Sequence, residues 1–363
     1  MRKLILSLFV LSIIIVSSPS IAEQVEPIDV FGLETYTCTD PETGIQAFSI
    51  LKPSDWNVTD NIIWKMDSSP PAAIGLKLES ADGSLSFELL PQTSYTWSDN
   101  ISENESSEKT NQLAPMDASE YLKNYLLPLQ LKGVRYSIIE TVNLPALSDL
   151  VSEMKLKSEL PDSATQTITS ARSTVEYVLN DITVREDFYS AITRIDTNLQ
   201  TLDGVQTSTD WIAEQQFRFR YPADDYMLKR SFFVSIIKSM IVNPDWLSVV
   251  EQIANTDTSS QPVDLKRIRP NVGNDTIDKV YMLLDVFDYI SDDFSDFSSC
   301  TLTVKDPYLK TSFELPTGYD FIWTDTYGKY ILTSHAAYDP NTDESRDARV
   351  SWVQMKILDI IQK

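Results

Sequence analysis

A long run of alternating apolar and polar residues, over 168–221, constrains the fold of this chain more than any other feature. The alternation holds over 175–179, stops at Asn180-Asp181, which is typical of a tight turn, and resumes over 184–192. A third segment ends at Phe217–Tyr221, where two arginines and three aromatic rings occupy opposite faces of a strand. The pattern predicts neighbouring antiparallel strands with one face packed on a core.

Shorter segments with period-two or helical spacing surround this run. Strands are predicted over 45–51, 74–78, 85–89 and 136–142, and helices over 117–128, 224–242 and 278–293. Strands and helices are segregated and show no βαβ rhythm, which favours an α+β class over a parallel sheet. We therefore expect a curved antiparallel sheet with packed helices.

Composition along the chain suggests a division into two parts. Residues 256–275 are polar, contain two prolines and one glycine, and are predicted to be a linker. The main α+β domain is then expected over 23–255. A smaller C-terminal module, of a helix and short strands, is expected over 276–363, with a final helix near Trp352.

Two blocks of the sequence resemble each other weakly. Asp40-Pro41 and Asp306-Pro307 each follow a cysteine, and each is followed by a phenylalanine, a proline and further aromatic residues. One interpretation is that the two blocks are the entry strands of duplicated units. The alternative, which we favour, is recurrent turn chemistry, because Asp-Pro is common in turns.

The N-terminus has the layout of a cleaved secretory signal peptide. Arg2 and Lys3 precede the apolar run Leu4–Val16, and Ser20-Ile21-Ala22 places small residues before a cut after Ala22. The alternative is an uncleaved membrane anchor. A helix over Leu4–Val16 spans about 20 Å at 1.5 Å per residue, short of the roughly 30 Å hydrocarbon core. We therefore predict a signal peptide over 1–22, and an exported protein with no membrane insertion after cleavage.

Export bears on the two cysteines, Cys38 and Cys300. An even pair in an oxidising compartment predicts a disulfide between them. Such a bridge closes most of the exported chain, and a loop of that length stabilises by about 5 kcal/mol in the loop-entropy description. The alternative is two buried, unpaired thiols.

Charge and composition exclude several kinds of activity. The formal net charge of −23 repels phosphate backbones, so a nucleic-acid partner is not expected. His335 is the single histidine, so it cannot build a usual zinc site and any Ser-His-Asp triad would have to use it. The Gly-x-Ser-x-Gly motif of such enzymes is missing from the sequence. Nine glycines leave few places for a phosphate-binding loop. No catalytic constellation is recognisable, which favours a protein that is not an enzyme.

One acidic segment matches part of the pattern for calcium. Oxygen-bearing side chains occupy alternate positions of a loop: Asp339, Asn341, Asp343, Ser345 and Asp347. Hard oxygen donors at this spacing suit Ca²⁺. The segment departs from an EF-hand loop, since Glu344 replaces the turn glycine and Val350 the bidentate glutamate. An acidic surface turn is the alternative.

The region 35–255 resembles Mog1/PsbP-like domains. The resemblance is carried by an apolar strand over 45–51, the stretch Pro53-Ser54-Asp55-Trp56, and a strand leading into a helix over 217–242. The polar insertion over 98–115 departs from that compact family. The resemblance implies helices packed on a curved antiparallel sheet and a role in binding or assembly, and it carries over no functional residue.

These observations favour an exported, soluble, non-enzymatic binding or assembly module at the cell envelope or outside the cell. Its expected partner is a protein or a carbohydrate at the cell surface. Two alternatives stay open: a secreted hydrolase that uses paired carboxylates, and a calcium-stabilised extracellular structural domain.

Overall fold

The structure is a computed structural model that describes residues 30–361, apart from 67, 69, 99–111, 156–159, 161–162, 202–203, 257–262 and 295–300. The predicted signal peptide with its cut after Ala22 lies outside the described residues, as does Cys300. Within the described part of the chain, no helix combines the length and apolar character needed to span a bilayer.

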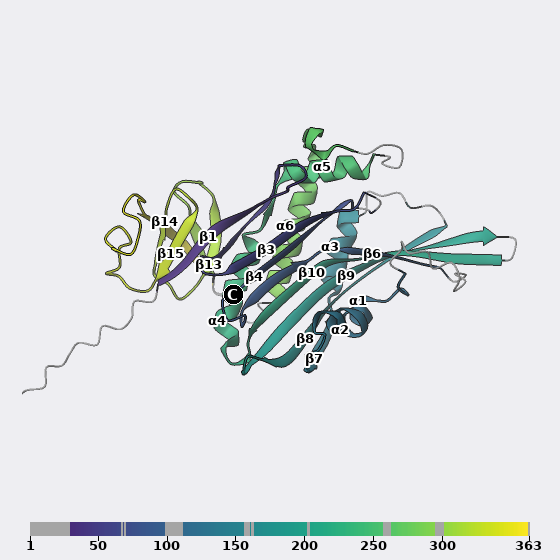
Figure 1. Ribbon diagram of the computed structural model, residues 1–363, viewed down its shortest axis with the longest axis horizontal. Helices are drawn as coiled ribbons and strands as arrows, with labels where there is room; N and C mark the ends of the chain where they lie inside the picture. The colour runs from purple at the N-terminus through teal and green to yellow at the C-terminus, as the bar shows by residue number, and fades with distance from the viewer. Residues whose placement is uncertain are drawn as a thin grey trace, which may run out of the picture.

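An eight-stranded antiparallel sheet forms the centre of the molecule (Figure 1). Its strand order is β3 (Asn57–Trp64), β4 (Ala72–Glu79), β5 (Ser86–Leu90), β10 (Gly204–Pro222), β9 (Ile182–Thr201), β8 (Ala164–Leu179) and β7 (Tyr136–Asn143), with β6 (Thr93–Ser98) also paired to β10. The long strands β8, β9 and β10 confirm the prediction over 168–221. The turn between β8 and β9 is Asn180-Asp181, with positive φ of 48° and 64°, as type I′ hairpin turns require.

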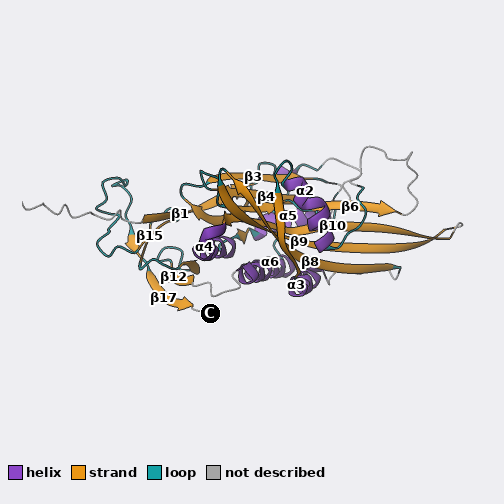
Figure 2. Ribbon diagram, turned by 90° about the horizontal axis from the view of Figure 1, so that it is seen from below, coloured by secondary structure: helices purple, strands orange, loops and turns teal. Residues whose placement is uncertain are grey.

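Helices cover both faces of this sheet (Figure 2). One face packs against α3 (Pro145–Lys155), α4 (Tyr226–Lys238) and α6 (Asn274–Phe294), and α5 (Pro244–Ala254) joins the same hydrophobic core. A second core lies on the other face, under α1 (Ala118–Tyr121), the π-helical turn η2 (Leu122–Leu126) and α2 (Leu127–Gln130). This helix begins as predicted, because Asp117 and Glu120 form a capping box.

Two smaller sheets complete the fold. The first has the order β11 (Ile241–Val242), β2 (Gln46–Pro53), β1 (Val30–Thr39), β15 (Lys329–Thr333), β14 (Phe321–Thr324) and β16 (Val353–Gln354). The second has the order β13 (Ser312–Pro316), β12 (Thr301–Lys305) and β17 (Lys356–Ile361). All three sheets are antiparallel, so the predicted α+β class with antiparallel sheets holds.

The structure differs from the predicted division at 256–275. The C-terminal strand β15 pairs with the N-terminal strand β1, and Figure 1 shows them side by side. Helix α6 buries Val286, Phe287 and Ile290 in the same core as β2 and α4. A polar segment marks a domain boundary only where few contacts cross it. Here the apolar face of α6 packs back onto the central sheet, so the two parts interleave.

The expected helix near Trp352 is wrong. Trp352 is followed by β16, and the last described residues form β17, which pairs with β12. Short apolar segments do not distinguish a strand from a helix by period alone. The segment Lys356–Ile361 forms a strand because it pairs with β12.

The two similar sequence blocks form the same hairpin turn. The carbonyl of Asp40 accepts from the Gly44 N–H at 2.8 Å, and that of Asp306 from the Lys310 N–H at 3.0 Å. Gly44 and Lys310 both have positive φ, 74° and 63°. Each turn joins two paired strands, β1 to β2 and β12 to β13. The shared turn fits both a duplicated unit and recurrent turn chemistry.

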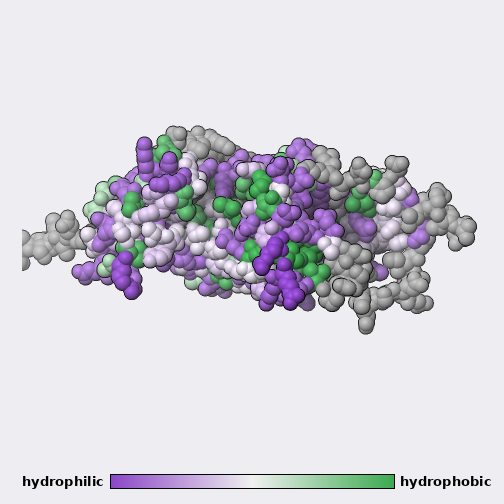
Figure 3. Space-filling model, turned by 90° about the horizontal axis from the view of Figure 1, so that it is seen from above, coloured by the Kyte–Doolittle hydropathy of each residue, from purple (hydrophilic) through white to green (hydrophobic). Residues whose placement is uncertain are grey.

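The surface is largely polar on the face drawn in Figure 3, where hydrophobic residues form small, separate patches. This agrees with the acidic composition. Isolated apolar residues of this kind are ordinary on protein surfaces.

Candidate functional site

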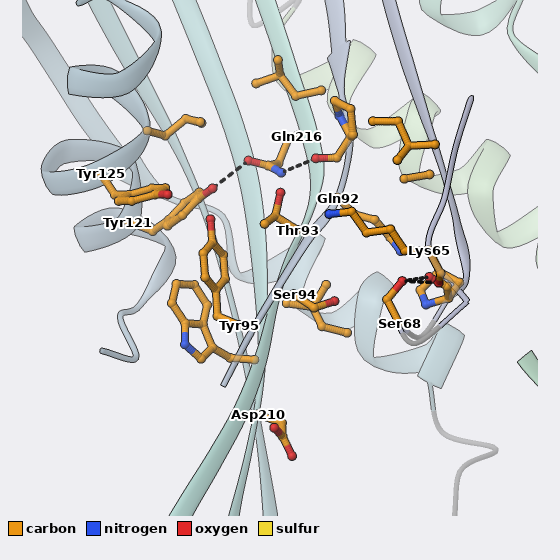
Figure 4. A pocket seen from close by; sticks show the side chains of 18 of the residues that line it. Lys65, Ser68, Gln92, Thr93, Ser94, Tyr95, Tyr121, Tyr125, Asp210 and Gln216 are labelled. Carbon is orange, nitrogen blue, oxygen red and sulfur yellow. Dashed lines mark hydrogen bonds between the residues drawn. The ribbon is translucent and has the colours of Figure 1, made fainter. Parts of the chain in front are cut away.

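A pocket of about 980 Å³ lies where the central sheet splits (Figure 4). Strand β4 pairs with β5 only over Leu76–Glu79, and β5 ends at Leu90. After Pro91 the chain continues as β6, which pairs with β10 and not with β4. Ala72 and Ala73 of β4 therefore face Thr93–Thr96 of β6 across the pocket.

The pocket reaches both faces of the sheet at this split. Trp211 and Ile212 are neighbours in β10, so their side chains point to opposite faces. Both nevertheless line the pocket. Among the described residues, the edge of β6 that faces away from β10 has no bridge partner over Thr93–Tyr95, whereas Thr96 forms an isolated bridge with Gln112.

A β-bulge in β10 shapes the floor of the pocket. Glu214 is paired with Ala191 and Phe217 with Tyr189, so β10 has one extra residue here, and Gln215 has a positive φ of 49°. The buried Gln216 accepts from the Tyr121 hydroxyl at 3.2 Å. Its amide nitrogen donates to the Pro91 carbonyl at 3.1 Å and to the Ala213 carbonyl at 3.2 Å. Gln216 thus fixes the helix and the kink at Pro91 to the same strand.

Four aromatic rings form one wall of the pocket. Tyr95 stacks on Trp211 with ring centroids 4.2 Å apart, and Tyr121 stacks on Tyr125 at 5.4 Å. The two stacks meet edge to face, as aromatic clusters prefer. Tyr121 and Tyr125 come from consecutive turns around η2, and π-helical turns are frequent at functional sites.

The pocket carries little charge. Lys65 and Asp210 are the only charged side chains among the described lining residues. Burial raises the pKa of Tyr121 to about 12, and burial also raises the pKa of Tyr95. Both hydroxyls therefore stay protonated and can donate hydrogen bonds at neutral pH. One carboxylate does not supply the acid and the second carboxylate that glycoside hydrolysis requires.

Carboxylates do cluster elsewhere, in a buried ionic network on the helix α1–α2 face of the sheet. Glu186 is fully buried, accepts from Arg218 Nε at 2.5 Å and from the Tyr177 hydroxyl at 2.7 Å, and lies 3.4 Å from Arg220. Arg218 also pairs with Glu88 at 3.0 Å. These carboxylates are neutralised by arginines, and none of them lines the pocket.

The structure places the five predicted calcium ligands in successive turns. Their oxygens accept hydrogen bonds from their own loop: Asp339 from Asn341, Asp343 from Ser345 and Tyr338, and Asp347 from Arg349. In the part of the chain that is described, no three His, Cys, Asp or Glu side chains form a group that could hold a metal. Calcium binding at these residues stays a prediction.

Cys38 is buried in β1, with 2% of its surface exposed, and forms no disulfide among the described residues. Burial, together with the hydrogen bond and charge of Asp60, raises the pKa of its thiol to about 12. Cys300 lies just before β12, outside the described residues. The Cys38–Cys300 disulfide therefore stays a prediction.

A thiol count tests this disulfide. We expect the denatured, unreduced protein to give no reaction with a thiol reagent, and the reduced protein to give two labelled cysteines, identified by mass spectrometry. A count of two thiols without reduction would contradict the disulfide. The raised pKa of Cys38 predicts that, if unbridged, it reacts slowly until the protein is denatured.

Sequence reasoning missed most of this site. It placed Tyr121 and Tyr125 on one helix, but it gave no role to Tyr95, Gln216 or Trp211. The only sequence signal at the split is Pro91, which cannot donate to a strand ladder and so ends pairing.

No protein-family model matches this chain, and no curated protein matches it either. The resemblance to Mog1/PsbP-like domains stays a prediction. We call the pocket between β4 and β6 the groove.

Proposed function

We propose that this protein is an exported, non-enzymatic binding module whose groove takes an extended peptide segment of a partner protein. The observation that supports this most is the split of the sheet at Pro91, which leaves the edges of β4 and β6 facing one pocket. The predicted signal peptide over 1–22 supports export from the cytoplasm. The single carboxylate in the lining supports binding rather than hydrolysis.

A peptide fits the groove because strand edges offer backbone hydrogen bonds. A peptide that adds to a strand edge gains affinity from main-chain bonds and specificity from pockets for alternate side chains. Ala72 and Ala73 leave room beside β4, while Leu90, Leu129 and Ile212 offer apolar contacts. The side chain of Leu129, at the rim, is exposed to solvent over about half of its surface.

A carbohydrate fits the groove less well. Sugar rings bind on open aromatic faces, whereas the faces of Tyr95, Tyr121 and Trp211 are used by stacking within the wall and these residues are buried. Of the four rings, Tyr125 alone is partly exposed. The wall therefore supports a peptide with one or two apolar anchors.

Selection from a phage library of random linear peptides tests the proposal. We expect the purified protein to enrich peptides with a shared apolar motif. Two substitutions, Leu129→Asp at the exposed rim and Tyr125→Ala at the half-buried ring, should each raise the dissociation constant of a selected synthetic peptide about tenfold. Loss of a contact worth about 1.4 kcal/mol has this effect. The affinity is measured by isothermal titration.

Val178→Asp is the matched control, because Val178 is an aliphatic residue that is at least as exposed as Leu129 and does not line the groove. It should leave the affinity unchanged. Enrichment of no peptide, or peptides that bind equally well to the Leu129→Asp and Tyr125→Ala variants, would refute the proposal. Binding to an array of oligosaccharides, without binding to any peptide, would show that the ligand is a carbohydrate and would also refute the proposal.

A further inference from the structure

Strand β7 forms an edge of the eight-stranded sheet and is apolar where edges are usually protected. No strand of the described residues pairs with its outer side. Ile138, Ile139 and Val142 are exposed by 42%, 51% and 38%. Natural edge strands are commonly blunted by lysine, proline, shortening or a β-bulge. The eight-residue strand β7 contains neither lysine nor proline, and one bulge, between Ile138 and Glu140, is its only feature of this kind. Such an edge can pair with another strand.

A bulge in β7 sets which residues would face a partner. Ile138 is paired with Val175 and Glu140 with Thr174, so Ile139 is the extra residue. Counted in paired positions, Arg135 lies two positions before Ser137, and Glu140 lies two positions after it. Opposite charges are therefore placed symmetrically about Ser137.

We propose that β7 pairs with β7 of a second copy of this chain, antiparallel, about a two-fold axis at Ser137. In that register Arg135 lies opposite Glu140 of the partner subunit, and the symmetry repeats the pair. Tyr136 lies opposite Ile138 of the partner subunit, which makes two aromatic–aliphatic pairs. Cross-strand pairs of both kinds stabilise antiparallel ladders.

Two charges, Arg135 just before β7 and Glu140 within it, support a second copy as the occupant. Arg135 has no ion-pair partner in the described part of the chain. Glu140 contacts Arg172 at 2.9 Å but keeps 48% of its side chain exposed, so it can accept from a second arginine. A self-complementary surface closes on itself about a two-fold axis, the commonest symmetry of soluble oligomers.

This interface goes beyond the proposed peptide groove and leaves it open. The groove lies at β4 and β6, and β5, β10, β9 and β8 separate β4 from β7 in the sheet. Pairing of β7 joins two central sheets into one and places one groove on each side. A dimer of this form would offer two peptide sites.

Cysteine cross-linking tests the axis directly. A residue on the two-fold axis lies opposite itself, with Cα atoms about 5 Å apart, a separation that a disulfide spans. We expect Ser137→Cys to form a covalent dimer under mild copper-phenanthroline oxidation. Asn143→Cys is the control, because five paired positions from the axis put the two copies roughly 30 Å apart. It should stay monomeric on a non-reducing gel.

Charge variants test the register in solution. Sedimentation velocity should show a dimer for the purified wild-type protein at micromolar concentration. Arg135→Glu should raise the dissociation constant at least tenfold, whereas Lys132→Glu, an equal charge change outside the register, should change it less than twofold. The double variant Arg135→Glu/Glu140→Lys restores opposite charges and should recover most of the affinity.

Thermal unfolding of each variant separates loss of pairing from loss of folding. A wild-type protein that sediments as a monomer throughout this range would overturn the proposal. A dimer that Arg135→Glu leaves intact, or equal cross-linking of the two cysteine variants, would also overturn it. A folded double variant that stays as weak as Arg135→Glu would overturn the proposed register.

Discussion

Replacing Arg218 with methionine is expected to lower the free energy of unfolding by about 4 kcal/mol, measured by urea denaturation. Methionine keeps much of the side-chain volume but removes the charge. Glu186, which is fully buried on the α1–α2 face of the sheet, then loses the nearer of its two arginines and keeps only Arg220 at 3.4 Å. Removing one partner from a buried ionic network costs several kcal/mol, far more than the lost packing.

Two further variants isolate the charge. Arg185→Met removes an arginine from a partly exposed pair with Glu176, and its effect should stay within about 1 kcal/mol. Glu186→Gln combined with Arg218→Met should be less destabilised than the sum of the single variants, because neither charge is then left alone. Additive effects would mean that the network does not act through this pair.

The alternation of residues was sufficient to predict β8, β9 and β10, but it did not reveal the bulge. Trp211 and Phe217 are both odd-numbered, so a regular strand puts them on one face. The extra residue in β10 puts Trp211 in the core beneath α1 and Phe217 in the core beneath α4 and α6. The buried apolar residues of β10 are odd-numbered both before and after the bulge, so the alternation in the sequence continues without a break and does not reveal the extra residue.

The arrangement of the C-terminal part could not be read from local sequence. The polar residues before α6 correctly indicate surface loops, but they do not say whether the helix returns to the same core. Phe287 belongs to the helical apolar pattern over 278–293, and only the position of the sheet shows what it contacts. Pairing of β15 with β1 joins residues about 300 apart, which no local pattern specifies.

The groove was unpredictable for the same reason. Its lining comes from four segments: 63–73, 90–96, 121–130 and 195–216. Of these, 121–130 and 195–216 overlap elements predicted from the sequence, on ordinary packing grounds, whereas 63–73 and 90–96 lie outside the predicted strands and helices. The site exists because β4 and β6 part at Pro91, and because Gln216 bonds to Tyr121 and to the Pro91 carbonyl across that split. Such a site is a property of register and not of a motif.

Replacing Asp40 with alanine is expected to cost about 4 kcal/mol of unfolding free energy, by loss of several charge-assisted hydrogen bonds worth roughly 1.5–3 kcal/mol each, offset by partial relaxation. Asp40 is fully buried in the turn between β1 and β2. Its Oδ2 accepts from the indole nitrogens of Trp64 at 3.1 Å and Trp246 at 2.8 Å. One carboxylate thus holds the turn, β3 and α5 together, and its loss leaves two indole donors unpaired.

Asp40→Asn should not restore this stability, because the amide presents a donor where the site needs acceptors. Asp82→Ala is the matched control, since Asp82 caps the exposed turn between β4 and β5 and holds no second element through its side chain. Its cost should stay below about 1 kcal/mol. Urea unfolding followed by tryptophan fluorescence measures the free energy of unfolding of all three variants. A loss for Asp40→Ala no larger than that for Asp82→Ala would mean that these two indoles contribute packing alone, and that α5 is held by its apolar face.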